Sequence, residues 1–345
     1  MSGTLETRAR QREIAERSKV SISTVSRCLR GKLDVDAETR SKVQKIAAEL
    51  GYRLPASRAK MESCTTLGVF IATRPNQTSL YNMYLQGASQ AAEKLSALVT
   101  VSYAPPLERL ATWDQGVSPA AYEPGRLNGS ILIYDVAEQT ARHLTSLGPC
   151  VSIAHEFPGT RLSHVEADNL GGIRAIMERL YSLGHRRIGF VSRRPWHFLW
   201  HRRRMAAYLE CRHFMGLPED PSYCVQPDSL DDDAFDGLVA DRIIPLIKAG
   251  VRAWICVNDP VAALVYTRLV AAGYRIPQDV SITGFDGHKL PLLQTLTSVR
   301  LPAAEMGAAA TQLLVRQIRN SDPMPQTIVV DVDLIEGETS GPCPV

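Results

Sequence analysis

The stretch from Val20 to Gly31 carries small hydroxyl side chains and arginines at helical spacing. Ser21 is a good N-cap, because its hydroxyl can accept a hydrogen bond from the backbone N–H near Thr24. Gly31 is a natural helix end. One face of the predicted helix is apolar and formed by Val25, Cys28 and Leu29. The other face is therefore left open for an intermolecular contact.

This helix has the dimensions and chemistry to read DNA. A helix of about ten residues fits the major groove, and short side chains let its backbone approach the bases. Arg27 could donate two hydrogen bonds to guanine O6 and N7, a contact that gives roughly 1–3 kcal/mol of base discrimination. The pattern therefore predicts a DNA recognition helix.

Two further helices are predicted around the recognition helix. Residues 12–17 combine helix formers with Ile14 and Ala15 on a buried stripe. Downstream, Asp36 can cap a third amphipathic helix that ends at Gly51. Three short helices are typical of a small helix-turn-helix head.

Three segments of the head carry a family pattern. They are Val20-Ser21-x-x-Thr24-Val25-Ser26-Arg27-x-Leu29-x-Gly31, Glu38-Thr39-Arg40 and Glu49-Leu50-Gly51-Tyr52. With these segments the chain resembles the lactose-repressor (LacI/GalR) family of transcription regulators. The resemblance implies that Ile22, Ser23 and Arg27 read bases and that Ser21 and Thr24 lie close to phosphates. The predicted contacts of the head with DNA are Ser21, Ile22, Ser23, Thr24, Ser26, Arg27 and Arg30.

The head departs from the family pattern at three places. Lys19 stands where the family has a turn glycine, Arg30 replaces an asparagine, and Arg10-Gln11 replaces Thr-Ile before the first helix. None of these changes breaks the fold. A left-handed backbone at Lys19 would cost about 1 kcal/mol.

Residues 53–64 form a polar linker that can fold into one or two helical turns. In the family this segment is a hinge helix that inserts an apolar side chain into the minor groove. Counting from Tyr52 places Met61 at the inserted position, whereas counting from Pro55 places Glu62 there. Met61 is the predicted DNA contact because the inserted side chain must be apolar. A linker that does not bend DNA is the alternative.

Charge is concentrated at the N-terminal end. The chain of 345 residues has a formal net charge of +3, but residues 1–60 hold fourteen Lys and Arg against seven Asp and Glu. Such a segment suits DNA, although it also suits a plain solvated surface. The seven cysteines form no C-x-x-C pair, which indicates reduced thiols in a cytoplasmic protein. The N-terminal residues do not contain the apolar run that would indicate a secretion signal. No apolar stretch is long enough to predict a membrane-spanning helix.

From Thr66 onward, short apolar runs alternate with helical stretches, a pattern typical of parallel sheets covered by helices. The first round predicts strands at 67–71, 97–102, 129–134 and 150–154, with helices at 80–95 and 138–147. The second round predicts strands at 164–166, 187–191, 223–225, 253–257 and 281–285, with helices at 169–183, 203–215, 232–249 and 260–272. Two doubly wound α/β lobes follow.

The fold class is therefore α/β, with an N-terminal three-helix helix-turn-helix head, a hinge and two lobes. The lobes resemble the periplasmic-binding-protein-like domain that follows the head in this family. The predicted boundaries are 1–52 for the head, 53–64 for the hinge and 65–345 for the effector-binding and dimerisation domain. Within that domain the first lobe is assigned 65–163 and 301–324, and the second lobe 164–300 and 325–340.

Polar residues near the carboxyl ends of the predicted strands indicate a ligand site between the lobes. They are Thr73 or Asn76, Arg202, Asn258 and Asp286, and Trp196 and Trp200 lie in the same loop as Arg202. Carboxylates and guanidinium groups bind adjacent hydroxyls, and an aromatic ring can cover the apolar face of a sugar. The predicted effector is therefore a sugar or a sugar derivative. The resemblance implies effector contacts for Arg202, Asn258 and Asp286.

Each of these residues also has a structural alternative. Asn258 can cap a helix, Asp286 can cap a turn, and the two tryptophans can belong to the core. At least two of the arginines at 202–204 are expected to be solvated or ion-paired. The family's usual aspartate after the strand at 150–154 is absent, and Ala154-His155-Glu156 stands there.

Together these patterns predict a homodimeric transcription repressor that binds a palindromic operator and responds to a small effector without a cofactor or metal. His197 and His201 are four residues apart, but no third metal ligand is evident. The alternative is a small-molecule-binding protein or enzyme built on the same lobes without operator binding. The chain contains no G-x-G-x-x-G, Walker or G-x-S-x-G motif, which argues against an enzyme.

Overall fold

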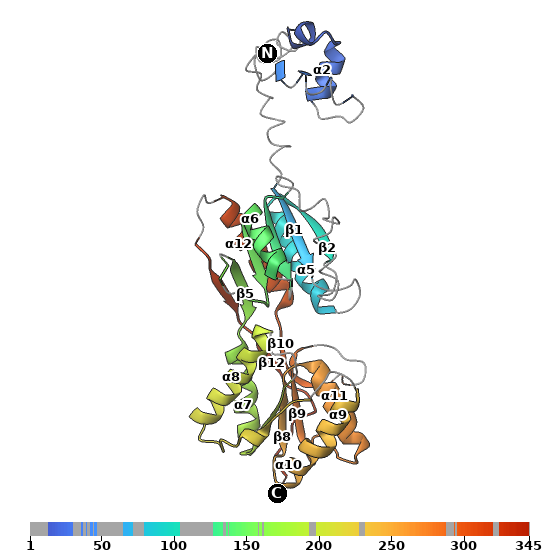
Figure 1. The fold of residues 1–345 in the computed structure, drawn as a ribbon. Helices are drawn as coiled ribbons and strands as arrows, with labels where there is room; N and C mark the ends of the chain where they lie inside the picture. The colour runs from blue at the N-terminus through green and yellow to red at the C-terminus, as the bar shows by residue number, and fades with distance from the viewer. Residues whose placement is uncertain are drawn as a thin grey trace. The chain divides into compact units, whose positions relative to one another are not determined.

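The computed structural model divides into two compact units, Met1–Cys64 and Thr65–Val345, and each is described by itself (Figure 1). The structure describes residues 13–29, 36, 39, 42–43, 45–46, 65–71, 79–103, 127–133, 136, 138–157, 159–160, 162–192, 198–227, 232–287, 293, 295–319 and 324–344. Within these ranges no helix has the length and apolar character needed to cross a membrane.

Unit 1 contains a helix over residues 13–18 and α2 (Ile22–Leu29), joined by a tight turn. Ser21 caps α2, because its Oγ accepts a hydrogen bond from the backbone N–H of Thr24 at 3.1 Å. Lys19 in the turn has a φ of 58°, the left-handed conformation predicted for it. The helices pack on a small core whose buried members are Ile14, Ala15, Val25 and Val43.

The first lobe of unit 2 is a six-stranded parallel sheet in the order β11-β5-β4-β3-β1-β2. Its strands are β1 (Thr65–Ile71), β2 (Ala97–Tyr103), β3 (Gly129–Ile133), β4 (Cys150–Ile153), β5 (Ser163–Ala167) and β11 (Thr327–Val330), and its helices are α5 (Ser79–Lys94), α6 (Glu138–Leu147) and α12 (Ala303–Arg319). Val69 and Ile71 of β1 pack in one core, and Phe70 packs in a second core with Leu144 of α6. Burial on both faces explains the continuous apolar runs in the sequence.

The second lobe is a six-stranded sheet in the order β12-β10-β9-β8-β6-β7, in which only β12 is antiparallel to its neighbour. Its strands are β6 (Ile188–Val191), β7 (Cys224–Val225), β8 (Ala253–Cys256), β9 (Ser281–Asp286), β10 (Thr297–Arg300) and β12 (Asp333–Ile335). Its α-helices are α7 (Asn169–Ser182), α8 (Leu199–Phe214), α9 (Asp232–Leu238), α10 (Ile244–Lys248) and α11 (Asp259–Ala271). The π-helical turn η4 (Val239–Ile243) interrupts the helix predicted over 232–249.

The lobe boundaries predicted from the sequence are wrong at two strands. β5 and β11 were assigned to the second lobe, but β5 pairs with β4 and β11 pairs with β5 in the sheet of the first lobe. The prediction failed because the described residues between β4 and β5, 154–157, 159–160 and 162, contain no helix of the kind that usually links adjacent parallel strands. The chain therefore passes between the lobes near Asp168, after Arg300, and between β11 and β12.

Two glycines allow α5 and α12 to pack closely in the first lobe. A Cβ atom on Gly87 would overlap the carbonyl oxygen of Ala304, and one on Gly307 would overlap the carbonyl oxygen of Tyr84. Both obstacles are backbone atoms that cannot rotate away. The helices therefore have to separate if either glycine acquires a side chain.

The substitution Gly307→Ala should lower the free energy of unfolding by about 2 kcal/mol, within the usual range for overpacking. Urea unfolding followed by circular dichroism measures the loss. Gly237→Ala is the matched control, since a Cβ there lies 3.9 Å from its nearest neighbour, Asp241. That helical change should be neutral or stabilise by up to about 1 kcal/mol. Equal effects of the two substitutions would contradict the close helix contact.

Candidate functional site

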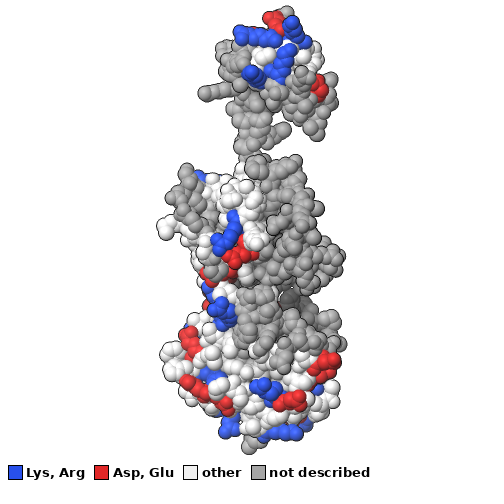
Figure 2. Space-filling model, in the orientation of Figure 1, with Lys and Arg blue, Asp and Glu red and all other residues white. Residues whose placement is uncertain are grey.

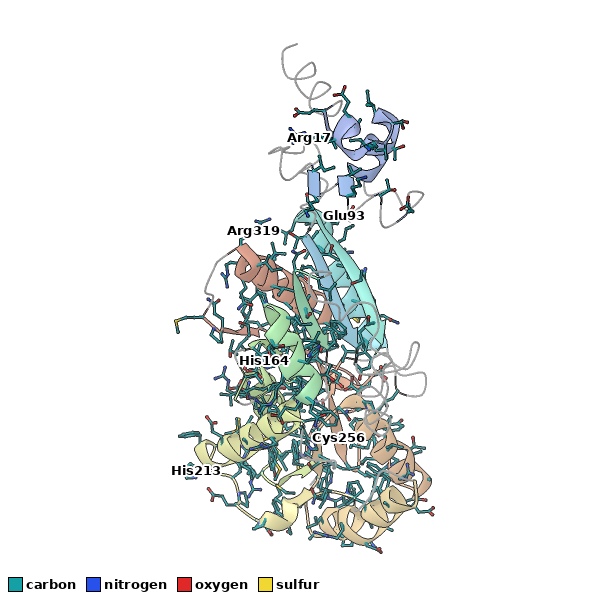
Figure 3. All side chains as sticks on the ribbon, turned by 45° about the horizontal axis from the view of Figure 1, so that its top comes forward. Arg17, Glu93, His164, His213, Cys256 and Arg319 are labelled. Carbon is teal, nitrogen blue, oxygen red and sulfur yellow. The ribbon has the colours of Figure 1, made fainter. Side chains whose placement is uncertain are left out.

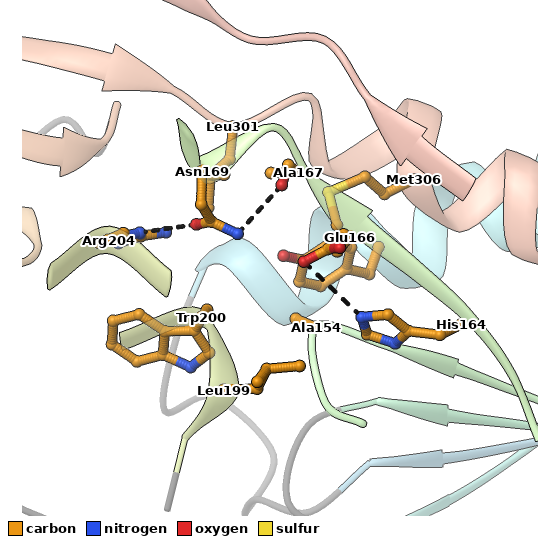
Figure 4. A pocket seen from close by; sticks show the side chains of 11 residues that line it. Ala154, His164, Glu166, Ala167, Asn169, Leu199, Trp200, Arg204, Leu301 and Met306 are labelled. Atoms are coloured by element: carbon orange, nitrogen blue, oxygen red, sulfur yellow. Dashed lines mark hydrogen bonds and ion pairs between the residues drawn. The ribbon is translucent and has the colours of Figure 1, made fainter. Parts of the chain in front are cut away.

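A pocket lies between the two sheets of unit 2, at the carboxyl ends of parallel strands (Figure 4). This is where open α/β sheets usually bind ligands. Four polar side chains line it, and they are His164, Glu166, Asn169 and Arg204. The other lining residues are Tyr84, Ala154, Ala167, Leu199, Trp200, Leu301 and Met306. A mostly apolar wall with a few convergent polar groups is typical of a small-molecule site.

Arg204 is the buried cation of this pocket, with 2% of its surface exposed. Its guanidinium donates hydrogen bonds to Asn169 Oδ1 at 3.0 Å, to the carbonyl oxygen of Val257 at 2.7 Å and to Asp286 Oδ1 at 3.1 Å. It also lies 3.7 Å from the ring centroid of Phe285. Groups from α7, β9 and the residue after β8 thus fix one planar side chain.

The periodicity of α8 explains why Arg204 is buried. The helix begins at Leu199, and its buried positions recur every three or four residues. They are His201, Arg204, Ala207, Tyr208, Cys211 and Arg212. Arg204 thus occupies the face of α8 that packs on its own lobe.

Asp286 is the anionic partner of Arg204 and the last residue of β9. Its φ of 134° is unusual for a residue with a side chain, and it turns the strand end toward Arg204. Burial raises the pKa of Asp286 to about 7; Arg204 opposes this shift, whereas the nearby Asp259 adds to it. Asp259 itself accepts a hydrogen bond from Ser298 Oγ at 2.6 Å.

The wall formed by the first lobe carries a second polar group, His164 and Glu166 on β5. Alternation along the strand places both side chains on one face. Arg203 of α8 forms an ion pair with Glu166, and its guanidinium is 3.7 Å from Glu156. Because Arg203 belongs to the second lobe, these ion pairs join the lobes.

His164 is held in its neutral form. Burial is the main reason that its pKa is lowered to about 4, and Arg203 and His155 add to the shift. Its Nδ1 lies 3.1 Å from Ser152 Oγ within the first lobe. Its Nε2 lies 4.0 Å from Glu166 Oε2, which is longer than a hydrogen bond (Figure 4).

Unit 1 presents the beginning of α2 to solvent. Ser21 and Ser23 are exposed, and Ile22 has 45% of its surface exposed although it is apolar. Ser21 Oγ lies 2.7 Å from Ser23 Oγ and 2.8 Å from Thr24 Oγ1, so three hydroxyls form one cluster. The backbone of Ser26 and Arg27 continues this helix. Their side chains, together with Arg30 and Met61, lie outside the described residues.

Basic side chains also lie on the surface of unit 1 (Figure 2). Those that the structure describes are Arg17, Lys19, Lys42 and Lys45, and all four are exposed. Arg17 projects from the first helix and pairs with Glu13 at 3.1 Å (Figure 3). The surface of this unit therefore offers cations as well as hydroxyl groups, a combination that suits a phosphate backbone.

Two family models match the chain in the expected order. The model of bacterial regulatory proteins of the lacI family matches residues 12–54, and the periplasmic binding protein-like domain matches residues 177–340. The chain belongs to the LacI family. It is a DNA-binding transcription regulator, and the predicted fold class is confirmed.

Relatives that match this LacI-family regulator over nearly their whole length are named as transcription repressors. The HTH-type transcriptional repressor CytR of Escherichia coli (strain K12) is 26% identical over 334 residues, which cover 96% of each chain. The ribose operon repressor of Haemophilus influenzae is 25% identical over 333 residues, covering 94% of this chain and 96% of the relative. Since both are named repressors, the comparisons support a regulator and not the alternative of an enzyme.

Solved structures share the fold. A complex of the transcriptional regulator CelR with cellobiose has a TM-score of 0.66 and 22% identity, and the match covers 94% of this chain and 98% of that one. The lac repressor dimer bound to operator and the anti-inducer ONPF has a TM-score of 0.63 and 19% identity, with 95% and 98% covered.

The effector contacts predicted for the LacI-family regulator fall into three groups. Trp200 lines the pocket, and Asp286 binds the arginine that lines it. Asn258 caps α11 by accepting from the N–H of Val261 at 3.1 Å, and Arg202 is exposed; neither lines the pocket. The remaining predicted contacts lie outside the described residues, and they are Thr73, Asn76 and Trp196. Across the described residues, no group of three or more His, Cys, Asp or Glu side chains could hold a metal ion.

Arg204, His164 and Glu166 are pocket residues that the sequence prediction missed. Arg204 could have been found from its spacing to Ala207 and Tyr208 on one apolar helix face. The two β5 residues could have been found because polar side chains alternate with Val165 in a short strand.

Neutral His164 should make the stability of the LacI-family regulator depend on pH. The unfolded chain binds a proton near pH 6.5 and the folded chain only near pH 4, so stability is fully present above pH 6.5 and is lost as the pH falls toward 4. Relative to His164→Gln, the wild-type free energy of unfolding should fall by up to about 3 kcal/mol between pH 7 and pH 4. Urea unfolding of both proteins across this range measures the difference. A difference that is constant with pH would show that His164 titrates normally.

Proposed function

We propose that this chain is a homodimeric transcription repressor whose affinity for a palindromic operator changes when a small polyhydroxylated effector binds between the lobes. The observation that carries the proposal is Arg204, a buried guanidinium fixed by Asp286 and Asn169 at the edge of the pocket between the lobes. Similar proteins support the effector class, since they include a ribose operon repressor and a regulator solved in complex with cellobiose.

The chemistry of the pocket suits a sugar or a sugar derivative. Trp200 lines the pocket and gives it an aromatic side chain that can contact the apolar side of a sugar ring. The Arg204 guanidinium lies over the same ring, 4.7 Å from its centroid. Arg204 and Asn169 offer polar atoms for hydroxyl groups. Trp196, Thr73, Asn76 and Asp286 complete the proposed effector contacts. No cofactor is part of the proposal.

Effector and DNA are coupled through the orientation of the lobes. A ligand that contacts residues of both lobes binds one relative orientation more tightly than another and shifts the population toward it. This change alters the ordering of the hinge at residues 53–64, and with it the affinity of the head for DNA. Coupling free energies of this kind are typically about 1–3 kcal/mol.

The proposed DNA contacts are the hydroxyl cluster and the arginines of the recognition helix. Ser21 and Thr24 bind phosphates, whereas Ile22, Ser23, Ser26, Arg27 and Arg30 approach the bases. Met61 of the hinge inserts into the minor groove. Two heads in a dimer read the two halves of the operator, and the protein acts in the cytoplasm, where bacterial DNA lies.

Fluorescence anisotropy on DNA from upstream of its own gene tests this function. Binding should be site-specific and weaken steeply between two salt concentrations, because phosphate contacts release counterions. One member of a panel of sugars and nucleosides should shift the affinity about 5- to 150-fold, the range expected for allosteric coupling. No site-specific binding under any condition would contradict the DNA half of the proposal, and no shift by any compound would contradict the effector half.

Arg27→Ala should relax the base preference at one position of each half-site, at a cost of about 1–3 kcal/mol for the preferred base. Anisotropy with operators changed at single positions measures this preference. Arg17→Ala is the control, since Arg17 is exposed and paired with Glu13 in the preceding helix. Arg17→Ala should lower the affinity for all operators about equally or leave it unchanged. An unchanged preference in Arg27→Ala would place base recognition elsewhere.

A further inference from the structure

The carboxylate that the first lobe contributes to the pocket comes from β5, and not from the end of β4 where the family has its aspartate. Ala154, which follows β4, lines the pocket with only a methyl group. The acidic side chain at this wall is Glu166 of the neighbouring strand β5, and 9% of its side chain is exposed. A buried carboxylate is costly unless it is paired, so its charge needs an explanation.

Arg203 provides that explanation. Its guanidinium pairs with Oε1 of Glu166 and lies 3.7 Å from Oε2 of Glu156. The side chain of Arg203 is 35% exposed, so it is the solvated end of the pair, whereas Glu166 is the end inside the pocket. The ion pair therefore stabilises an ionised carboxylate at the pocket wall without filling the pocket with a cation.

The second oxygen of Glu166 is arranged for a ligand. Oε2 lies 4.0 Å from Nε2 of His164, so the two atoms do not bond directly. His164 is anchored on its other side, where Nδ1 lies 3.1 Å from Ser152 Oγ. In the tautomer in which Ser152 Oγ donates to Nδ1, the Nε2–H of His164 is a donor, so one hydroxyl group can donate to Oε2 and accept from Nε2–H at once. The pair therefore matches an alcohol and not an anion.

The charges of the second lobe fit the same ligand. Arg204 already binds Asp286, and Arg203 already binds Glu166, so each arginine has a carboxylate partner. A carboxylate or phosphate group on the effector would lie close to the Glu166 carboxylate. Neither arginine would be unpaired to balance this added negative charge. Like charges in a desolvated pocket repel strongly.

We infer that Glu166 determines effector specificity: it accepts a hydrogen bond from a hydroxyl of a neutral polyhydroxylated effector and excludes acidic analogues. The inference rests on the proposed function, because it names the residue by which the pocket between the lobes selects its effector. Arg203 acts as a positioning residue that balances the charge of Glu166 and holds its carboxylate at the pocket wall.

Isothermal titration calorimetry on the full chain tests the inference. The probes are the neutral sugars D-ribose, D-glucose and cellobiose, and the acids D-gluconate and D-glucuronate. A neutral sugar should bind the wild type, and Glu166→Gln should weaken it about tenfold or more, because a charged hydrogen-bond acceptor is lost. The same variant should reduce the discrimination between D-glucose and D-glucuronate, which a purely structural ion pair would leave unchanged.

Two further variants separate ligand contact from structure. Glu138→Gln removes an exposed carboxylate of the first lobe whose ion-pair partner, Arg142, lies on the same helix, so it should change sugar affinity less than twofold. Glu166→Asp keeps the charge but shortens the side chain, so it should also lose affinity even if Glu166→Gln fails to fold. The melting temperature without sugar and the operator affinity confirm that each variant is folded.

The possible results test the role of Glu166, the neutral effector class and the sugar effector separately. Equal sugar affinity in the wild type and both Glu166 variants would overturn the role of Glu166 and leave the proposed function standing. Binding of acids alone to the wild type would overturn the neutral class. If the wild type binds its operator but none of these compounds, the sugar effector of the proposed function fails, and the inference fails with it.

Discussion

The burial of one arginine constrains the whole ligand-binding part of the molecule. A guanidinium cannot be deprotonated to escape a desolvated site, so Arg204 requires acceptors wherever the fold places it. The second lobe provides one acceptor each from α7, the end of β8 and the end of β9, through Asn169, Val257 and Asp286. These three elements must keep their relative positions for the Arg204 guanidinium to keep its hydrogen bonds. The pocket edge on this lobe is therefore rigid before any effector arrives.

The burial of Arg204 also affects two neighbouring carboxylates, those of Asp286 and Asp259. Asp286 would otherwise ionise near pH 4, yet burial and the neighbouring Asp259 raise its pKa to about 7. Ser298 reduces the conflict, since its hydroxyl donates to Asp259 at 2.6 Å while its oxygen accepts from the N–H of Gly287 at 3.2 Å. Two acids and one arginine thus share a small volume. The positive φ of Asp286 is the backbone conformation that places its carboxylate beside Arg204.

Local signals in the sequence predicted local structure well. The Ser21 cap, the left-handed Lys19 and the buried stripe of the first helix follow from neighbouring residues, and the structure confirms them. The resemblance implies an effector contact for Arg202, and the sequence places this residue in a loop before a helix predicted over 203–215. The helix begins at Leu199, and since adjacent residues differ by about 100° around a helix, Arg202 faces solvent. The strand pairing of β5 and β11 depends on residues far apart in the chain, so no local pattern could assign it.

Arg203 and Arg204 show how consecutive residues of one helix can serve different lobes. They diverge by about 100° around α8, so Arg204 turns into its own lobe while Arg203 reaches Glu166 and Glu156 of the first lobe. A rotation between the lobes leaves every partner of Arg204 in place but changes the distances from Arg203 to its carboxylates. Because the attraction weakens as these distances grow, the pair favours the lobe orientation in which Arg203 contacts Glu166. The intra-lobe pair therefore fixes the shape of the pocket, whereas the pair between the lobes makes their relative orientation sensitive to what binds beside Glu166.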